Sequence, residues 1–336
     1  FTIRATTVVN AAGVWADNIR QADEGQHPRS IRPAKGIHIT VPWKKVQNDI
    51  AIVIPVRRDK RSLFVVPWIS NGDGTYQYTY IGTTDTDFAG GVDESQTSAE
   101  DIDYVLEALN QSITTNVTVD DVTAVWSGLR PLVSNDDGTA AKGKTADLSR
   151  KHKVKVSPSG VISIMGGKLT TYRKMSEHTV DEVVKHTGKA GKCKTKNLAF
   201  IGADGFKASM LRGPDAHLAE RFGNELNAIK ELITENPSLS DPLIVGLPYL
   251  RAEAVFACRY EMAQTLDDVL SRRTRARIVN RRATLASARK VAELMAIELK
   301  WSAAEIDRQV ATFVDSCSRE EAAGLVSEAE FLASVQ

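Results

Sequence analysis

The sequence predicts mixed α/β and α+β structure followed by an all-α C-terminal domain, and three observations support this prediction. The β-branched stretch Ile3–Asn10 leads into the small-residue turn Ala11–Gly13 and a helical pattern over Val14–Arg20. Together these parts make half of a Rossmann-like nucleotide-binding unit. Residues 31–87 hold short β-rich runs separated by Pro, Gly and Asn-Gly, as in an antiparallel sheet. From about residue 215 to residue 335 the pattern is helical.

The individual elements follow from the same patterns. Four strands are expected at Gly36–Val41, Ile50–Val56, Arg61–Pro67 and Thr75–Gly82, with Asn71–Gly74 as a hairpin loop. A helix is expected to begin near Thr97, because Thr97 and Glu100 have capping-box spacing. Later elements are a strand at Val122–Leu132, a hairpin of Val154–Val156 with Val161–Met165, and a helix over Thr171–His186. The helical part is expected to break near Pro237–Pro248, Arg277–Asn280 and Trp301.

Composition excludes several classes of protein. The 336 residues are about two domains' worth of chain, and 42% hydrophobic with 25% charged residues is typical of a globular protein. The formal net charge of +1 argues against a globally basic nucleic-acid binder. Three scattered cysteines favour a reducing compartment and have no metal-ligand spacing. No apolar run approaches the ~20 residues of a membrane span. Because the chain begins at Phe1 inside an expected strand, we expect it to be part of a longer protein.

The segment Gly138–Thr145 matches the phosphate-binding pattern G-x-x-x-x-G-K-T. Such a loop needs a buried strand before it and a helix after it. Here Ser134–Asp137 precedes the segment and a Lys-rich stretch follows, so neither flank fits. We therefore predict a surface loop.

Four features are candidates for a functional site. Ala11–Gly13 is either an ordinary turn or a place where the backbone approaches a dinucleotide. Gly166–Thr171 follows a strand and opens a helix, with two threonines able to cap it, so it places backbone N–H groups and Lys168 together. Arg130, between Gly and Pro, is either a surface residue or a fork-shaped donor for carboxylate or phosphate. His38 on a strand is more often structural than catalytic.

The span Ser271–Lys290 carries seven Arg and one Lys with no acidic residue. It is either a salt-bridged helix face, with Glu261, Asp267 and Asp268 as partners, or a patch for anionic lipid.

Six stretches together resemble the FAD-dependent glycerol-3-phosphate dehydrogenase family, in the family's order and over nearly the whole chain. They are V-N-A-A-G-V-W-A-D (Val9–Asp17), R-P-A-K-G-I-H (Arg32–His38), Y-I-G-T-T-D-T-D (Tyr80–Asp87), W-S-G-L-R-P-L (Trp126–Leu132), M-G-G-K-L-T-T-Y-R (Met165–Arg173) and Ala252–Arg273. The resemblance implies a partial FAD-binding Rossmann-like domain, an antiparallel-sheet substrate domain and an all-helical C-terminal domain. The expected division is 1–30 and 150–190 for FAD binding, 31–149 for substrate and 191–336 for the helical domain.

The resemblance also implies which residues act. Residues similar to the family's FAD contacts are Ala11, Ala12, Gly13, Gly167, Lys168, Leu169 and Thr170. Those similar to its catalytic residues are Arg130, Lys168 and His38. The implied reaction oxidises glycerol 3-phosphate to dihydroxyacetone phosphate and passes the electrons to a quinone. Arg130 would position the substrate and assist hydroxyl deprotonation, and Lys168 would steady the reduced flavin or the alkoxide.

The family's G-x-G-x-x-G segment is absent from this chain, since Gly72-Asp73-Gly74 lacks the third glycine. The resemblance therefore covers the C-terminal portion of such an enzyme, and we expect the chain alone to be inactive. Two alternatives stay open: a glycerol-3-phosphate oxidase that uses oxygen, and a non-catalytic module for substrate docking or membrane attachment. Expected partners are a quinone, the membrane surface and a second copy in a homodimer, without nucleic acid. The expected location is cytoplasmic, on the inner face of the cell membrane.

Overall fold

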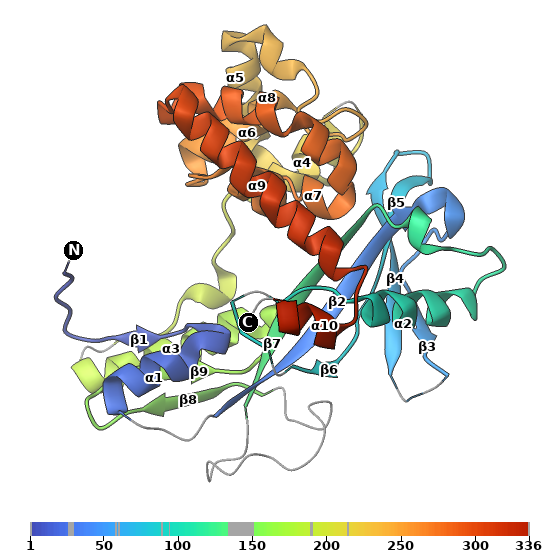
Figure 1. The fold of residues 1–336 in the computed structure, drawn as a ribbon. Coiled ribbons are helices and arrows are strands. Elements are labelled where there is room, and N and C mark those ends of the chain that lie inside the picture. Colours follow the sequence, from blue (N-terminus) through green and yellow to red (C-terminus); the bar gives the residue numbers. More distant parts are fainter. Residues whose placement is uncertain are drawn as a thin grey trace. The chain divides into compact units, whose positions relative to one another are not determined.

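The computed structural model describes residues 2–25, 30–57, 59, 61–88, 90–93, 95–133, 151–188, 191–213 and 215–334. The chain divides into two compact units (Figure 1). The first comprises Phe1–Gly36, Thr84–Ser95 and Ser127–Leu198, and the second comprises Ile37–Thr83, Gln96–Trp126 and Ala199–Gln336. Both units are therefore built from segments that are distant in sequence. The four-part domain division expected from the sequence stays a prediction.

The first unit is organised around a small sheet of order β1-β9-β8. Its strands are β1 (Val9–Asn10), β8 (Lys153–Val156) and β9 (Ile162–Met165), and its helices are α1 (Ala16–Glu24) and α3 (Tyr172–Thr187). Strands β8 and β9 form the predicted hairpin, whereas β1 pairs with β9 in parallel. Both helices pack against β9, and a small core joins Ala16, Ile31, Val133 and Met165. This arrangement is the strand–turn–helix unit that the sequence predicts.

The first unit also contains parts of longer strands. Residues up to Gly36 of β2 (Ile31–Pro42) pair with β6 (Thr86–Asp87), with Lys35 opposite Thr86. The end of β7 (Ala124–Val133) carries Arg130 into this unit. Its described residues also include short 3-10 turns at Gly13–Trp15, Leu169–Thr171 and Thr195–Asn197.

The second unit begins with an antiparallel sheet of order β3-β4-β5-β2. Its strands, besides β2, are β3 (Ile52–Pro55), β4 (Ser62–Ser70) and β5 (Tyr76–Gly82), and its first helix is α2 (Ala99–Asn110). Strands β4 and β5 pair on either side of the predicted Asn71–Gly74 loop. Alternate apolar side chains of the strands form one core with the apolar face of α2, as the predicted patterns require.

The rest of the second unit is helical, as predicted. The helices are α4 (Ala216–Phe222), α5 (Leu226–Glu235), α6 (Arg251–Tyr260), the π-helix η10 (Asp268–Arg273), α7 (Ala276–Val279), α8 (Arg281–Leu299), α9 (Ala303–Ala323) and α10 (Glu328–Ser334). Breaks fall between α5 and α6, between α7 and α8, and before α9, at the predicted places. Two apolar cores hold the helices together. No helix in the described ranges has the length and apolar character needed to cross a membrane.

Two expectations about element bounds are corrected. The strand expected over Ile3–Asn10 is only Val9–Asn10, because β1 finds its ladder partner at Ile162 and Ser163 at the start of the short β9. The capping box at α2 lies one residue later than predicted. Ser98 is the N-cap, and its hydroxyl and the carboxylate of Asp101 each accept from the other's backbone N–H. A capping box needs an N-cap outside the helix, and Ser98 has this extended backbone.

This cap gives a first prediction. Ser98→Ala should lower the free energy of unfolding by ~1 kcal/mol, because it removes an acceptor for the backbone N–H of Asp101. Ser98→Asn should retain most of the stability, since asparagine also caps helices well. Urea denaturation followed by circular dichroism measures both variants. Equal losses for alanine and asparagine would show that the cap is not the stabilising feature.

Candidate functional site

Two turns of the first unit lie at the same edge of the small sheet. Strand β1 runs parallel to β9, with Val9 opposite Ile162 and Asn10 opposite Ser163. Each strand ends in a glycine-containing turn and continues into a helix, α1 or α3. Because carboxyl ends of parallel neighbours point the same way, the turn Ala11–Gly13 and the turn Gly166–Thr170 lie next to each other. In open α/β sheets this edge is where nucleotides bind.

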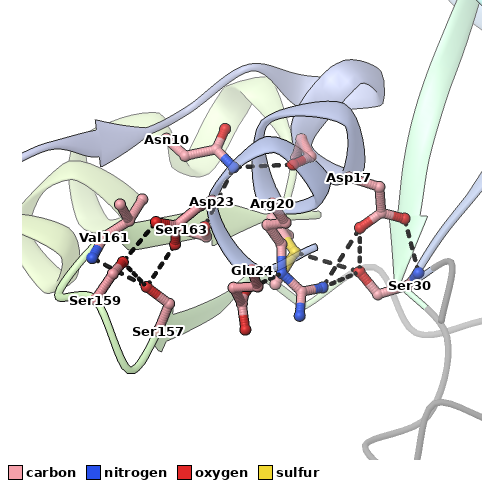
Figure 2. A network of polar contacts seen from close by, with 12 residues as sticks. Asn10, Asp17, Arg20, Asp23, Glu24, Ser30, Ser157, Ser159, Val161 and Ser163 are labelled. Atoms are coloured by element: carbon pink, nitrogen blue, oxygen red, sulfur yellow. Dashed lines mark hydrogen bonds and ion pairs between the residues drawn. The ribbon is translucent and has the colours of Figure 1, made fainter. Parts of the chain in front are cut away.

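The side chain of Asn10 fixes the first turn (Figure 2). Its Oδ1 accepts from the backbone N–H of Ala12 at 3.2 Å, and its Nδ2 donates to the carbonyl of Ala16 at 2.9 Å and to Ser163 Oγ at 3.2 Å. Asn10 is buried, so these contacts are not shared with solvent. Gly13 has φ +61° and open space where a Cβ would be. The turn is therefore rigid, and its backbone is open to a ligand.

A second polar network fixes the start of β2 (Figure 2). The carboxylate of Asp17 accepts from the backbone N–H groups of Ser30 and Ile31 at 2.7 and 2.8 Å. Arg20 is only 6% exposed and donates to Ser30 Oγ at 2.8 Å, beside Asp17. The last residue of the V-N-A-A-G-V-W-A-D stretch thus has a structural role, which sequence reasoning did not identify.

The second turn requires its two glycines. Gly166 and Gly167 have φ of +71° and +87°. A Cβ on Gly166 would lie 2.8 Å from Val133 Cγ2 and 2.9 Å from the Lys151 carbonyl oxygen, so it has no room. Lys168 and Thr170 are exposed, and the apolar side chain of Leu169 is 87% exposed. An exposed leucine beside main-chain N–H groups at a strand end suits contact with an aromatic ligand that carries polar edges.

One expectation about this turn is wrong. Thr170 and Thr171 were expected to cap the following helix through their hydroxyl groups. The 3-10 turn Leu169–Thr171 and the helix α3 both lack a side-chain cap. The Thr171 hydroxyl instead donates to the Lys168 carbonyl at 2.9 Å. The threonine hydroxyl therefore tightens the turn and leaves the first N–H groups of the turn without a side-chain cap.

The guanidinium of Arg130 packs closely against Gly36 in the first unit. A Cβ on Gly36 would lie 2.5 Å from both Nη1 and Nη2 of Arg130, so only glycine lets the guanidinium rest against β2. Nη1 also lies 3.5 Å from Asp85 Oδ1, and the Asp85 side chain is only 9% exposed. Three residues further along β7, Val133 packs against the Gly166 position, about 10 Å away along the strand. The strand therefore leads from Arg130 to the second turn.

Lys35 and Asp85 are candidates that sequence reasoning missed. Lys35 is fully buried, and its ammonium lies 6.0 Å from the centroid of the Phe88 ring. Buried charged groups are rare outside paired or functional positions. Both residues lie inside the stretches that resemble the family, but one lysine within a strand and one aspartate between two strands give no separate signal. Only the fold brings Asp85 to Arg130.

His38 lies in the second unit, within an aromatic cluster. Its ring stacks on Trp126 at 4.9 Å with an interplanar angle of 7°, and it meets the edge of Tyr80. Gly82 lies opposite His38 in the β2–β5 ladder, and a Cβ there would collide with the imidazole. The stacking fixes the ring plane of His38. Arg130 and Lys168 lie in the first unit, and the catalytic roles of all three residues stay predictions.

A histidine pair lies behind the second turn. His152 Nε2 is 2.8 Å from His178 Nδ1, and a Cβ on Gly167 would lie 3.2 Å from His152 Cβ. Burial, and secondarily the charge of His178, lower the pKa of His152 below its ordinary value. The pair is therefore in its stable form when His152 is neutral and one ring donates to the other.

This pair predicts a pH dependence of stability. Below a pH of about 6.5, His152 becomes protonated in the unfolded chain while it remains neutral in the folded chain. Unfolding is therefore increasingly favoured as the pH falls from that value toward the folded pKa. His152→Gln should reduce the loss of urea midpoint between about pH 7 and pH 5.5. His186→Gln, at an exposed position of α3, is the matched control and should leave the loss unchanged.

The basic span Ser271–Lys290 is largely neutralised by acidic partners. Arg272 pairs with Asp267 and Asp268, and Arg273 pairs with Asp268, as the salt-bridged alternative predicts. The other pairs are Arg277 with Asp267 and Glu320, Arg281 with Glu320 and Glu321, and Arg289 with Asp307. Among the described residues, Arg275, Arg282 and Lys290 have no acidic partner. The salt-bridged alternative therefore describes most of the span. The segment Gly138–Thr145 lies outside the described residues.

The two turns fit FAD, the cofactor that the resemblance implies. Gly13 keeps the first turn open, Gly167 lets the second turn pack closely on Met175, Lys168 supplies a cation, and the exposed Leu169 supplies an apolar contact. The main-chain N–H groups of the second turn suit the carbonyl edge of a reduced flavin. All predicted FAD contacts fall on these two turns, at one edge of the sheet.

Comparison with known proteins gives two family matches. Residues 1–173 match the family described as FAD dependent oxidoreductase, and residues 193–306 match the C-terminal domain of alpha-glycerophosphate oxidase. The chain is 34% identical over 325 residues to glycerol-3-phosphate dehydrogenase 2 of Mycobacterium tuberculosis, covering 93% of this chain and 53% of that protein. It is 33% identical to the mitochondrial glycerol-3-phosphate dehydrogenase of Mesocricetus auratus, covering 92% of this chain and 43% of that protein.

A solved structure is similar as well. It is the glycerol-3-phosphate dehydrogenase from Bacillus halodurans complexed with FAD, with a TM-score of 0.76 and 30% identity, covering 95% of this chain and 62% of that one. The chain thus spans about half the length of the curated relatives it matches. These matches confirm the predicted family, its cofactor FAD and the predicted fold class.

Proposed function

Since the chain belongs to the FAD-dependent oxidoreductase family, we propose that the whole protein oxidises sn-glycerol 3-phosphate to dihydroxyacetone phosphate. The observation that carries this proposal is the pair of glycine turns at the shared carboxyl edge of β1 and β9. The substrate rests on relatives named glycerol-3-phosphate dehydrogenase, which align with more than nine-tenths of this chain. When bound at these turns, FAD would supply the acceptor for the hydride from C2 of the substrate.

We propose that Arg130 binds and orients the substrate. A guanidinium fixed by Gly36 and Asp85 offers paired N–H donors at a constant position, and such a fork matches a phosphate or a developing alkoxide. Lys168, exposed at the second turn, would place a positive charge beside the flavin edge and stabilise negative charge that forms there. His38, which the resemblance places among the catalytic residues, would accept the proton of the C2 hydroxyl.

We further propose a quinone as electron acceptor, a homodimer, and peripheral attachment to the inner face of the cell membrane. A quinone dissolves in the bilayer, so a protein that reduces it has to reach the membrane surface. Arg275, Arg282 and Lys290 leave exposed positive charge on the second unit, which suits anionic lipid. Co-sedimentation with phosphatidylglycerol vesicles at low and high salt tests the attachment, and binding indifferent to salt would remove the charged residues from the proposal.

The reaction is tested by the visible spectrum of the whole protein under anaerobic conditions. Glycerol 3-phosphate should bleach the flavin band and yield an equal amount of dihydroxyacetone phosphate, whereas glycerol should leave the band unchanged. A flavin band that persists in excess glycerol 3-phosphate would contradict the proposal. Adding a quinone analogue or oxygen to the reduced protein then separates dehydrogenase from oxidase, because only the oxidase reaction releases peroxide at a comparable rate.

This chain by itself gives a second spectrum. After incubation with FAD and gel filtration we expect it to be colourless, because it carries no G-x-G-x-x-G segment for the ADP half of the cofactor. A retained flavin band that bleaches with glycerol 3-phosphate would show instead that the two turns suffice to bind FAD.

A further inference from the structure

The helical part of the second unit contains a cavity of about 360 Å³ between α8 and the loop that precedes α6. One stripe of α8 forms one wall, because its lining residues recur at helical spacing from Ala283 to Leu294. Ala283 and Ala286 are too small to fill the space, and Leu243 and Val291 supply buried apolar surface. The volume is at the lower end of the range for small-molecule sites.

The loop opposite α8 is fixed by backbone hydrogen bonds. Leu243 N–H donates to the Tyr249 carbonyl at 2.7 Å, and Arg251 N–H donates to the Asp241 carbonyl at 3.0 Å. Despite this rigid base, Val245 near the tip is 84% exposed. Val245 thus adds apolar surface to the rim of the cavity.

Positive charge lies at the same cavity. Two cations line it, Arg251 and Lys290. Arg251 pairs with Asp241 at 3.0 Å, whereas Lys290 is exposed and has no acidic partner among the described residues. One positive charge therefore remains uncompensated beside an apolar wall.

We propose that this cavity binds the tail of a singly charged anionic amphiphile of the straight-chain carboxylate class, with Lys290 as the cation for the head group. A straight chain suits the stripe of α8, in which two alanines lie one turn apart. Apolar surface supplies most of the affinity, and the lysine selects an anionic head over a neutral one. The inference stands on the cavity alone and does not depend on the proposed redox reaction.

Calorimetric titration of the whole protein with butyrate, hexanoate, octanoate and decanoate tests the proposal. Each added pair of methylenes should tighten Kd about tenfold until the cavity is full. Decanol, which has the same tail without the charge, should bind about tenfold more weakly than decanoate. The absence of saturable decanoate binding below about 1 mM would overturn the proposal.

Three variants locate the binding site. Lys290→Ala should weaken decanoate binding about tenfold and leave decanol binding unchanged. Arg289→Ala is the charge-matched control on the same helix, because Arg289 pairs with Asp307 of α9 and does not line the cavity. Ala286→Trp should fill the cavity and abolish binding while the unfolding midpoint is retained, since Ala286 is exposed. Decanoate binding to Ala286→Trp at wild-type strength would place the ligand elsewhere and overturn the proposal.

The source of the amphiphile is separated by a vesicle experiment. If Lys290→Ala and Ala286→Trp both reduce co-sedimentation with phosphatidylglycerol vesicles, the acyl chain comes from a bilayer lipid. If the two variants bind vesicles as the wild type does but lose decanoate, the ligand is a dissolved carboxylate. Either result supports the site. If both variants keep wild-type binding to vesicles and to decanoate, the proposal is contradicted.

Discussion

Arg130→Ala in the whole protein is expected to lower kcat/KM for glycerol 3-phosphate about 100- to 1,000-fold. The guanidinium is held by Gly36 and Asp85 at one position, so its charge-assisted hydrogen bonds to substrate need no reorganisation. Arg130→Lys should recover only part of the loss, because an ammonium keeps the charge but not the fork. Steady-state kinetics with a quinone analogue measures all three proteins, and wild-type kcat/KM in Arg130→Ala would remove Arg130 from the substrate site.

The packing of the Arg130 guanidinium against Gly36 can be tested without changing Arg130. In Gly36→Ala the new Cβ would displace the guanidinium, which is the far end of a flexible side chain. We therefore expect kcat/KM to fall about 10- to 100-fold with a small change in unfolding midpoint. Gly128→Ala is the matched control on β7, since a Cβ there meets nothing within 4 Å. If Gly36→Ala kept wild-type kcat/KM while Arg130→Ala lost it, the packing of the guanidinium against Gly36 would be irrelevant to turnover.

Gly223→Ala is expected to lower the free energy of unfolding of the helical part by about 4 kcal/mol. Gly223 has φ +58° and ψ −131°, a conformation that residues with a Cβ adopt only with strain of about 1–3 kcal/mol. Its Cβ would also lie under 3.0 Å from the backbone of Gly202, and overpacking costs a further ~1–3 kcal/mol. Backbone cannot move aside as a side chain does, because Asn224 N–H donates to the Gly202 carbonyl at 2.7 Å.

Gly246→Ala separates the two causes of this loss. Gly246 also has positive φ, +82°, but a Cβ there meets nothing within 4 Å. Its alanine variant should therefore lose only the conformational part, about 1–2 kcal/mol. Urea denaturation of both variants, with tryptophan fluorescence as the signal, gives the comparison. Equal losses at the two positions would mean that the close approach of Gly202 and Gly223 contributes nothing.

The architecture was predictable because its signals are local. Alternating strands around Asn71–Gly74 and the helical breaks near Pro237 and Asn280 follow from turn chemistry and periodicity, and the structure has them at those places. The one-residue error at Ser98 has a similarly local origin. Thr97 and Ser98 are both good caps, and only the extended backbone of Ser98 with the carboxylate of Asp101 decides between them.

The site was predictable only in part. The two glycine turns could be recognised from their strand–turn–helix context, but their adjacency depends on the pairing of β1 with β9, which no short-range pattern encodes. The contacts of Arg130 with Gly36 and Asp85 likewise join three separate segments. Lys35 could not be singled out, because a lysine within a strand is usually exposed and its full burial comes from the packing around β2 and β6.

The parallel pairing of β1 with β9 also sets an order of assembly during synthesis. Val9 leaves the ribosome long before its partner Ile162, and at 5–20 residues per second the interval is roughly 8 to 30 seconds. The hairpins of β3, β4 and β5 close over short distances and can form within that time. The β1–β9 pairing therefore forms after the sheet of the second unit can be completed. The edge that carries both glycine turns is a late product of folding, and early truncation of the nascent chain removes it entirely.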